Sequence, residues 1–225
     1  VKLMGITKPR IHVDTVQGGV ISAGAQSGAT WRNATSVGWW LPSGDPSTFT
    51  TDYWGTMRGR TDKVGNLNFF IPAARAWYGQ NTIDRAFDKG IVGYWHDEGD
   101  EGPDTGDITS ASNFYNPLYQ ESVYTYQRAN RSGTRVWSMN RHSYLGAQRY
   151  GYGVWSGDIT TDWRTLLTEA PRMLQTINAG MARTGTDAGG TSGEDTSVGV
   201  TGSDSVGKNV PSGELYARWV QFAAM

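Results

Sequence analysis

The chain has 225 residues, and its 20 Lys and Arg against 21 Asp and Glu give a net charge of −1. This length can bury the core of one large domain. The balanced charge gives no indication of nucleic acid or an anionic membrane as a partner. The absence of Cys excludes disulfides, zinc–thiolate sites and a Cys nucleophile. Ten Trp and 30 Gly indicate a loop-rich protein with aromatic surfaces, which suit sugar rings but also fill cores.

No apolar run approaches the length of a membrane-spanning helix, and no signal peptide is recognisable. The first and last segments, VKLMGI and VQFAAM, are apolar and look cut, so we expect an internal slice of a longer protein. The sequence leaves the oligomeric state and the compartment open, and a secreted or cell-surface bacterial location is favoured.

In chain order, the pattern first predicts a buried strand at residues 1–6. Residues 12–66 are rich in Gly, Ser, Thr, Asp and Trp. A structureless loop of this length is improbable in a compact domain, so they predict an insertion with short strands of its own. A helix is predicted over 72–89, where Ala76, Ile83 and Phe87 share a face, and a buried strand follows over 90–96.

The second half repeats this alternation of helices and strands. A helix is predicted over 114–131, with Leu118, Tyr119, Val123 and Tyr126 as its apolar stripe. The remaining predicted elements are strands at 134–140 and 151–156, a helix at 161–180 bending near Pro171, a strand at 181–186, and a last helix from 213 capped by Ser212. Alternation of this kind predicts an α/β protein with a parallel sheet.

Polar residues follow the predicted strands where these end. They are Lys8 and Arg10, Asp97, Arg141, and Asp158 with Asp187 further along. Function at strand ends is the rule for a (β/α)8 barrel and also for an open doubly wound sheet. No GxGxxG or GxxxxGK[ST] motif follows a strand, which weighs against a nucleotide-binding open sheet.

An acidic run, WHDEGDEGPDTGD, occupies residues 95–107. Read as a calcium loop from Asp97, it has Gly102 at position 6 but Ile108 where a bidentate acid is needed. Read from Asp100, it has Thr105 in place of the glycine. An EF-hand is therefore disfavoured. An irregular calcium site, a solvated acidic turn and an active-site rim all stay open.

Two carboxylates from different strand ends could flank one glycosidic bond. Asp97 follows Trp95-His96, and Asp158 follows Trp155-Ser156-Gly157. In a barrel, two such strand ends can bring carboxyl groups to about 5–5.5 Å, the separation of a retaining glycosidase. Two solvated loop aspartates are the alternative interpretation.

Longer blocks of the sequence carry a family resemblance. GIVGYWHDEGDE resembles the nucleophile strand of glycoside hydrolase family 31, in which an apolar strand ends in W-x-D. RVWSMNRHSYLGAQRYGYGVWSGDITTDW resembles the acid/base segment of that family, and GTDAGG resembles its later G-x-D-x-G-G block. ELYARWVQFAAM is similar to the helix that follows, and VKLMGITKPRI to the strand that precedes these blocks. All of them stand in family order.

The resemblance implies a (β/α)8 barrel, incomplete here because only central strands are present, and exo-acting, retaining hydrolysis of α-glycosides. Asp97 would be the nucleophile that forms a covalent glycosyl-enzyme. Asp158 would protonate the departing oxygen and then activate water. Arg141 and Asp187 match positions that bind hydroxyls of the cleaved sugar. Trp155 would form an apolar wall beside that sugar.

Lys8, Arg10, Trp40 and His142 are further substrate-binding candidates, with His142 beside Arg141. Lys8-Pro9 stands where glucose-cleaving members commonly carry Asp before Pro, so a base replaces an acid that grips glucose hydroxyls. This departure argues against glucose as the cleaved sugar, and α-N-acetylgalactosamine and α-galactose are considered instead.

TKPRI and W-x-D-E are similar to branches that include α-N-acetylgalactosaminidases and glucosyltransferases. Two alternatives therefore stay open. One is an α-glucosyltransferase or other transglycosylase that uses the same covalent intermediate, and the other is a carbohydrate-binding relative without catalysis. In each case we expect an oligosaccharide or glycoconjugate partner, and no cofactor, metal, nucleic acid or membrane.

Overall fold

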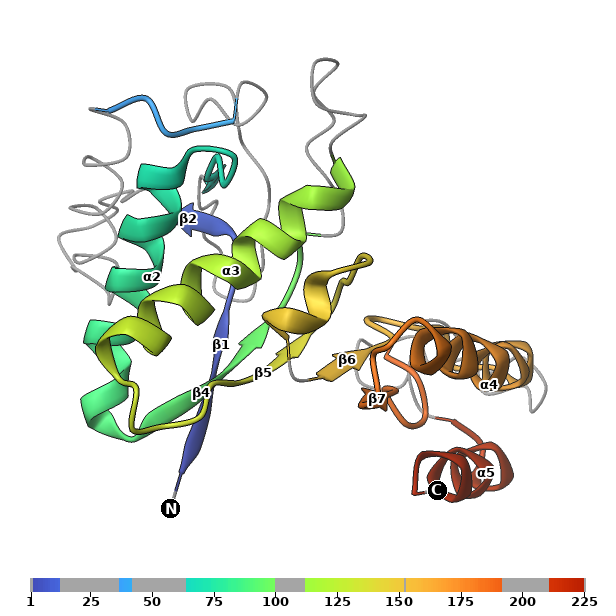
Figure 1. Ribbon diagram of the computed structural model, residues 1–225. Coiled ribbons are helices and arrows are strands. Elements are labelled where there is room, and N and C mark those ends of the chain that lie inside the picture. Colours follow the sequence, from blue (N-terminus) through green and yellow to red (C-terminus); the bar gives the residue numbers. More distant parts are fainter. Residues whose placement is uncertain are drawn as a thin grey trace, which may run out of the picture. The chain divides into compact units, whose positions relative to one another are not determined.

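The computed structural model describes residues 2–12, 37–41, 64–99, 112–151, 153–191 and 211–224 (Figure 1). The chain divides into two compact units, Val1–Trp137 and Ser138–Met225. Parallel strands alternate with helices in the chain order of both units, which confirms the predicted α/β class. No helix in these described ranges is long and apolar enough to cross a membrane.

The first unit is built on two parallel strands. β1 (Leu3–Thr7) pairs with β4 (Ile91–His96), and the register puts Thr7 opposite His96. β-Branched and aromatic side chains favour the extended backbone of β4, as predicted for residues 90–96. Because the two strands end side by side, the residues that follow them, Lys8 and Asp97, emerge at the same edge.

A short antiparallel ladder follows β1. β2 (Arg10–His12) pairs with β3 (Val64–Asn66), and an isolated bridge joins Trp40 to Leu67. These elements include the two ends of the predicted insertion at residues 12–66. The rest of that insertion lies outside the described residues, apart from 37–41.

Two helices lie together beside β1 and β4 in Figure 1. α2 (Pro72–Ala86) starts with proline in its first turn, as predicted, and continues into the short 3₁₀ helix η3 (Phe87–Lys89). α3 (Ser112–Asn130) packs along it. Edge-to-face rings fill the core between them: Phe69, Tyr78, Tyr115 and Tyr119.

The predicted apolar faces of these helices were only partly right. On α2, Ile83 is buried but Ala76 is exposed, and Tyr78 takes the inner position. On α3, Tyr119 and Val123 are fully buried, whereas Leu118 and Tyr126 are half-buried. The buried face of α3 also carries polar side chains that an apolar stripe does not anticipate: Asn116, Gln120 and Gln127.

The second unit contains a parallel set of short strands. β5 (Trp137–Asn140) begins at the unit boundary and pairs with β6 (Gly153–Trp155), which pairs with β7 (Thr184–Gly185). Each is shorter than predicted. The 3₁₀ helix η5 (Ala147–Arg149) lies in the connection between β5 and β6.

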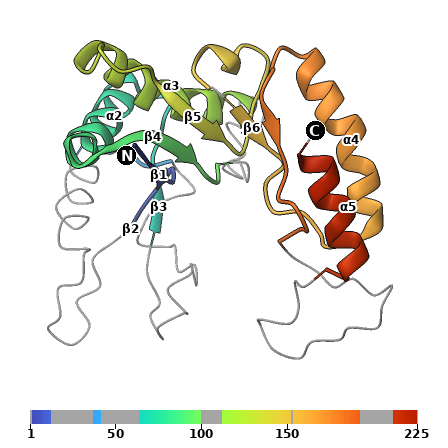
Figure 2. The same ribbon diagram turned by 90° about the horizontal axis from the view of Figure 1, so that it is seen from below.

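Two capped helices complete the second unit. The carboxylate of Asp162 accepts a hydrogen bond from Thr165 N (2.6 Å) at the start of α4 (Trp163–Asn178), which continues through Pro171. Ser212 caps α5 (Gly213–Ala223) as predicted, accepting from Leu215 N at 3.2 Å. Figure 2 shows α4 and α5 side by side, and buried Trp219 anchors their shared cluster with Ile159, Leu215, Trp163, Leu166 and Phe222.

Candidate active site

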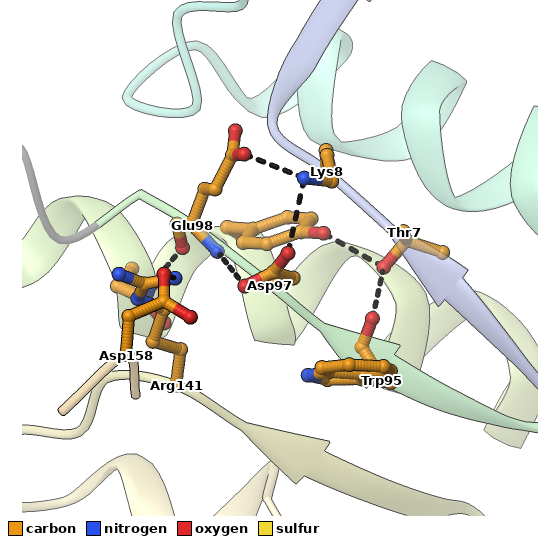
Figure 3. Close-up of polar contacts among 9 residues, drawn as sticks. Thr7, Lys8, Trp95, Asp97, Glu98, Arg141 and Asp158 are labelled. Carbon is orange, nitrogen blue, oxygen red and sulfur yellow. Dashed lines mark hydrogen bonds and ion pairs between the residues drawn. The ribbon is translucent and has the colours of Figure 1, made fainter. Parts of the chain in front are cut away.

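The ends of β1 and β4 carry a compact ionic cluster (Figure 3). The backbone N–H of Asp97 donates to the carbonyl of Thr7 (3.0 Å), so the strand pairing extends one residue past β4. This bond fixes Asp97 beside the residue after Thr7, which is Lys8. Asp97 is only 8% exposed and Glu98 only 7%, so both carboxylates lie largely out of water.

Lys8 bridges these two carboxylates. Its Nζ lies 3.0 Å from Oδ2 of Asp97 and 2.5 Å from Oε1 of Glu98. The exposed fractions of the three side chains are 24%, 11% and 10%. Burying a charge is costly unless it is paired, and one ammonium here partly offsets two carboxylates.

The backbone at Glu98 is held in an uncommon conformation. Its φ is 63°, in the left-handed region that residues other than glycine seldom adopt. In this conformation its N–H donates to Oδ1 of Asp97 (3.0 Å), and its carbonyl accepts from Nδ2 of Asn116 (3.0 Å). Nε2 of Gln120 in turn donates to Oδ1 of Asn116 (2.7 Å). Such strain persists where surrounding contacts impose it, often at functional sites.

Gly99 completes this arrangement. Its φ is 86°, and a Cβ at this position would come within 2.9 Å of Nδ2 of Asn116. Both the conformation and the close approach therefore require glycine. The polar inner face of α3 thus holds the segment after β4 in place.

Two buried tyrosines bond to the end of β1 next to the ionic cluster. The Tyr78 hydroxyl donates to the carbonyl of Lys8 (2.6 Å), and the Tyr119 hydroxyl lies 2.7 Å from Oγ1 of Thr7. Burial raises the pKa of Tyr78 to about 12 and raises the pKa of Tyr119 well above 10.0. Both hydroxyls therefore stay neutral and position the end of β1. His96 packs edge-to-face on Tyr119, with ring centroids 4.9 Å apart.

A second acidic site lies in the second unit, just past β6. Nη1 of Arg141 donates to Oδ2 of Asp158 at 2.8 Å (Figure 3). The Asp158 side chain is 57% exposed, whereas that of Arg141 is 17% exposed. Gly157 has φ 73°, and a Cβ there would lie 3.2 Å from Nε of Arg141, so glycine lets the guanidinium approach the chain.

Ser156 joins the ends of β6 and β7. Its carbonyl accepts from Nη2 of Arg172 on α4 (3.0 Å), and its hydroxyl lies 3.3 Å from that of Thr186. The same hydroxyl accepts from the backbone N–H of Asp187 at 3.4 Å. Arg172 also pairs with the buried carboxylate of Glu169 (3.2 Å). These bonds fix the strand ends that carry Asp158 and Asp187.

A cavity of about 140 Å³ opens beside these strand ends within the second unit. Arg141 and His142 line it, together with Trp155, which is 5% exposed. Glu169 and Arg172 from α4 contribute a second charged pair to the lining.

The structure thus brings several predicted site residues together within each unit. Lys8 contacts Asp97 in the first unit, and Arg141 contacts Asp158 in the second. Two predicted binding residues lie elsewhere. Arg10 belongs to β2, and Trp40 is half-buried against the core of the first unit. The roles of all these residues in binding or catalysis stay predictions.

Sequence reasoning missed the positioning groups. They are Thr7, Tyr78, Asn116 and Tyr119 around the ionic cluster of the first unit, and Ser156 and Arg172 at the strand ends of the second unit. The spacing of Asn116 and Gln120, four residues apart and therefore on one face of the helix, was the available signal for Asn116. Glu98 stood in the acidic run but had no assigned role. Among the described residues, no three of His, Cys, Asp or Glu gather as a metal site would require, and residues 100–107 of the acidic run lie outside them.

Residues 1–225 match the family described as "Glycosyl hydrolases family 31 TIM-barrel domain". The chain therefore belongs to glycoside hydrolase family 31, a family of glycosidases, and the predicted barrel fold is confirmed.

Two curated relatives illustrate the range of this family. A 1,6-alpha-glucosyltransferase from Sporosarcina globispora is 34% identical over 100% of this chain and 16% of its own length. An alpha-xylosidase from Saccharolobus solfataricus is 32% identical over 46% of this chain and 16% of its own length. The chain thus spans 16% of the length of either relative.

Solved structures agree on the fold. A family 31 dextranase from Flavobacterium johnsoniae, complexed with glucose, has a TM-score of 0.69 at 20% identity, covering 98% of this chain and 26% of the dextranase. A xylosidase from Aspergillus niger has a TM-score of 0.67 at 22% identity, covering 98% of this chain and 32% of that protein.

Proposed function

We propose that this chain carries the catalytic carboxylates of a retaining, exo-acting α-glycosidase that works through a covalent glycosyl-enzyme. The single observation that carries the proposal is the fixed, largely buried carboxylate of Asp97 at the end of β4. Both of its oxygens have a defined partner, Lys8 and the N–H of Glu98. A nucleophile held in this way loses little orientational freedom before it attacks.

Asp158 is proposed as the acid that protonates the departing oxygen and then as the base that activates water. Its exposure of 57% supports this role, because the same group must take up and release a proton in every cycle. Arg141 orients its carboxylate through a single hydrogen bond of 2.8 Å. Asp187 and Trp155 are proposed to contact the sugar hydroxyls and one face of the ring.

A second candidate function is transfer of the sugar to another sugar rather than to water. The whole-chain similarity to a 1,6-alpha-glucosyltransferase favours it. Both functions use the same covalent intermediate, so the residues discussed here would serve either one. The two differ in which acceptor reaches the glycosyl-enzyme.

The cleaved sugar is not assigned. Lys8 in place of an acid argues against a standard glucose pocket, whereas relatives are named for glucosyl transfer and for xyloside cleavage. We therefore keep glucose and xylose beside α-galactose and α-N-acetylgalactosamine as candidates.

The test uses the full-length protein that contains this chain. p-Nitrophenyl α-glycosides of glucose, xylose, galactose and N-acetylgalactosamine are assayed for release of nitrophenol. NMR of the first-formed product reports its anomeric configuration, and we expect retention. Added free oligosaccharide distinguishes the two functions, because a transglycosylase forms longer products while a hydrolase releases only free sugar. Inversion would contradict the proposal. Binding of sugar without any turnover would favour a non-catalytic relative.

A further inference from the structure

In the ionic cluster, Lys8 contacts two carboxylates that behave differently in the proposed reaction. Nζ of Lys8 lies 3.0 Å from Oδ2 of Asp97 and 2.5 Å from Oε1 of Glu98 (Figure 3). Asp97 would change charge during each cycle, whereas Glu98 would keep its charge. Lys8 therefore contacts one carboxylate whose negative charge is lost and regained in each cycle, Asp97, and another whose charge is constant, Glu98.

The two half-reactions fix when the charge on Asp97 changes. In the first, a bond forms between an Asp97 oxygen and C1 of the sugar, the bond from C1 to the departing oxygen breaks, and Asp158 gives that oxygen its proton. In the second, a water oxygen bonds to C1, its proton passes to Asp158, and the electron pair of the ester bond returns to Asp97. Asp97 loses its negative charge in the first half-reaction and regains it in the second.

An ammonium beside Asp97 stabilises every state in which that carboxylate is charged. It therefore stabilises the free enzyme more than the transition state of attack. It also stabilises the transition state of release more than the ester. We propose that Lys8 accelerates release of the sugar from Asp97 and thereby keeps the glycosyl-enzyme from accumulating. This inference rests on the proposed function.

Glu98 has a distinct task in the same scheme. While Asp97 is an ester, it is a much weaker partner for Lys8, whose side chain is only 24% exposed. A partly buried ammonium without a counter-charge is costly. Glu98 supplies that counter-charge, and Asn116 and Asp97 fix its backbone through hydrogen bonds of 3.0 Å each. Glu98 is thus a positioning residue that acts through Lys8.

The two residues should have opposite kinetic effects. In a Lys8→Gln variant, the ester on Asp97 should decay more slowly than in the wild type, by about tenfold at least. It should form at least as fast as in the wild type. In a Glu98→Gln variant, Lys8 no longer shares its charge with Glu98 and stabilises the Asp97 carboxylate more strongly, so the ester should form about tenfold more slowly and decay no more slowly. Lys8→Arg keeps the cation and should restore fast decay. General damage to the site would lower both rates in every variant.

The experiment measures the two half-reactions separately in the full-length protein. The α-glycosyl fluoride of the cleaved sugar is mixed with each variant, and rapid quenching with mass spectrometry follows the adduct on Asp97. Lys89→Gln is the control, because Lys89 is an exposed lysine on η3 of the same unit. We expect the adduct to accumulate in Lys8→Gln but not in the wild type, Lys8→Arg or Lys89→Gln.

Equal adduct decay in Lys8→Gln and Lys89→Gln would overturn the inference. If Lys8→Gln does not fold, Glu98→Gln decides, since unchanged adduct formation in that variant contradicts the inference equally. A ring-fluorinated glycosyl fluoride traps slow adducts in the wild type. If it labels a residue other than Asp97, the proposed function itself fails. If it labels Asp97 but decay does not depend on Lys8, only the inference fails.

Discussion

The two proposed catalytic carboxylates have contrasting surroundings. The Asp97 side chain is 11% exposed and each of its oxygens has a fixed partner, whereas the Asp158 side chain is 57% exposed and is held by Arg141. A nucleophile gains from being oriented before it attacks, and a proton carrier gains from access to solvent. The contrast therefore matches two different tasks for residues of the same type.

The contrast extends to the supporting residues. Asn116, on the polar inner face of α3, donates to the carbonyl of Glu98, and buried tyrosine hydroxyls bond to the neighbouring Thr7 and Lys8. The strand end that carries Asp158 is held by Arg172, which donates to the carbonyl of Ser156, two residues earlier. We expect the first unit to tolerate little change around Asp97, and the second unit to tolerate more around Asp158.

The largest expected effect is loss of the nucleophile. Asp97→Asn keeps the size of the side chain but removes the charge that attacks C1, so kcat on aryl α-glycosides should fall by about 10,000-fold. Steady-state kinetics of the full-length protein measure this. Asp88→Asn, on the exposed surface of η3, is the control and should leave kcat unchanged. Near-normal turnover by Asp97→Asn would remove Asp97 from the mechanism.

Removal of the acid/base group should have an effect that depends on the substrate. Asp158→Asn should lower kcat/KM by about 100- to 10,000-fold for substrates with a poor leaving group. It should affect glycosyl fluorides far less in the first step, because fluoride needs little protonation. Added azide should restore turnover of the glycosyl-enzyme by replacing activated water. A uniform loss across leaving groups, without azide rescue, would argue that Asp158 is not the acid/base.

The contribution of Asn116 to holding the segment after Asp97 can be tested with a matched pair of glycine substitutions, at Gly99 and at Gly90. Gly90 and Gly99 have φ of 92° and 86°, but a Cβ contacts Asn116 only at Gly99. Gly90→Ala should cost about 1 kcal/mol of unfolding free energy from backbone strain. Gly99→Ala should cost about 1–3 kcal/mol more from the clash and should also lower kcat. Urea unfolding measures both, and equal losses in the two variants would mean that Asn116 does not brace this segment.

The looser support of Asp158 predicts a smaller effect. Arg141→Lys keeps the charge but loses the planar guanidinium that reaches Oδ2 of Asp158, so kcat should fall by about tenfold. The decrease should again be greatest for poor leaving groups, as expected for a residue that orients the acid. A change in KM alone would instead assign Arg141 to binding of the sugar.

The smallest effect concerns alkaline pH and the buried tyrosine beneath Lys8. Burial raises the pKa of Tyr78 from 10.0 to about 12 in the folded protein. The unfolded chain therefore releases this proton first, and the unfolding free energy should decrease as pH rises between 10 and 12. Urea unfolding over this range should show a shallower decrease for Tyr78→Phe. An identical pH dependence in wild type and variant would contradict the assignment.

Much of the fold could be predicted because its signals are local. Apolar runs predicted the strands β1 and β4, and the capping residue Ser212 predicted the start of α5. The expected burial of the first strand was wrong, because Leu3, Met4 and Ile6 of β1 are exposed. The predicted buried face of α2 was wrong at Ala76, which is exposed, whereas Tyr78 is buried. A small residue can lie on either side of a helix, and tertiary packing decides which side is buried. The lengths of β5 to β7 depend on partner strands, which the local pattern does not contain.

The candidate site residues that stand in sequence motifs could be predicted. The contacts between segments far apart in the sequence could not. Asp97 and Asp158 stand at strand ends within recognisable blocks. Lys8 was expected to contact substrate, but its contacts with Asp97 and Glu98 join residues about 90 positions apart. Asn116 braces Glu98 through a backbone carbonyl, an interaction that no side-chain pattern reveals.

The left-handed backbone at Glu98 has a consequence for attempts to make this protein more heat-resistant. Glycine or asparagine would relax that residue, and either would look like a favourable choice on conformational grounds. Each would also discard the carboxylate that holds Lys8. Selection for thermal resistance alone should therefore favour variants at this position that survive heating but turn over poorly. Stability engineering would thus replace Glu98, whereas selection for turnover should retain it.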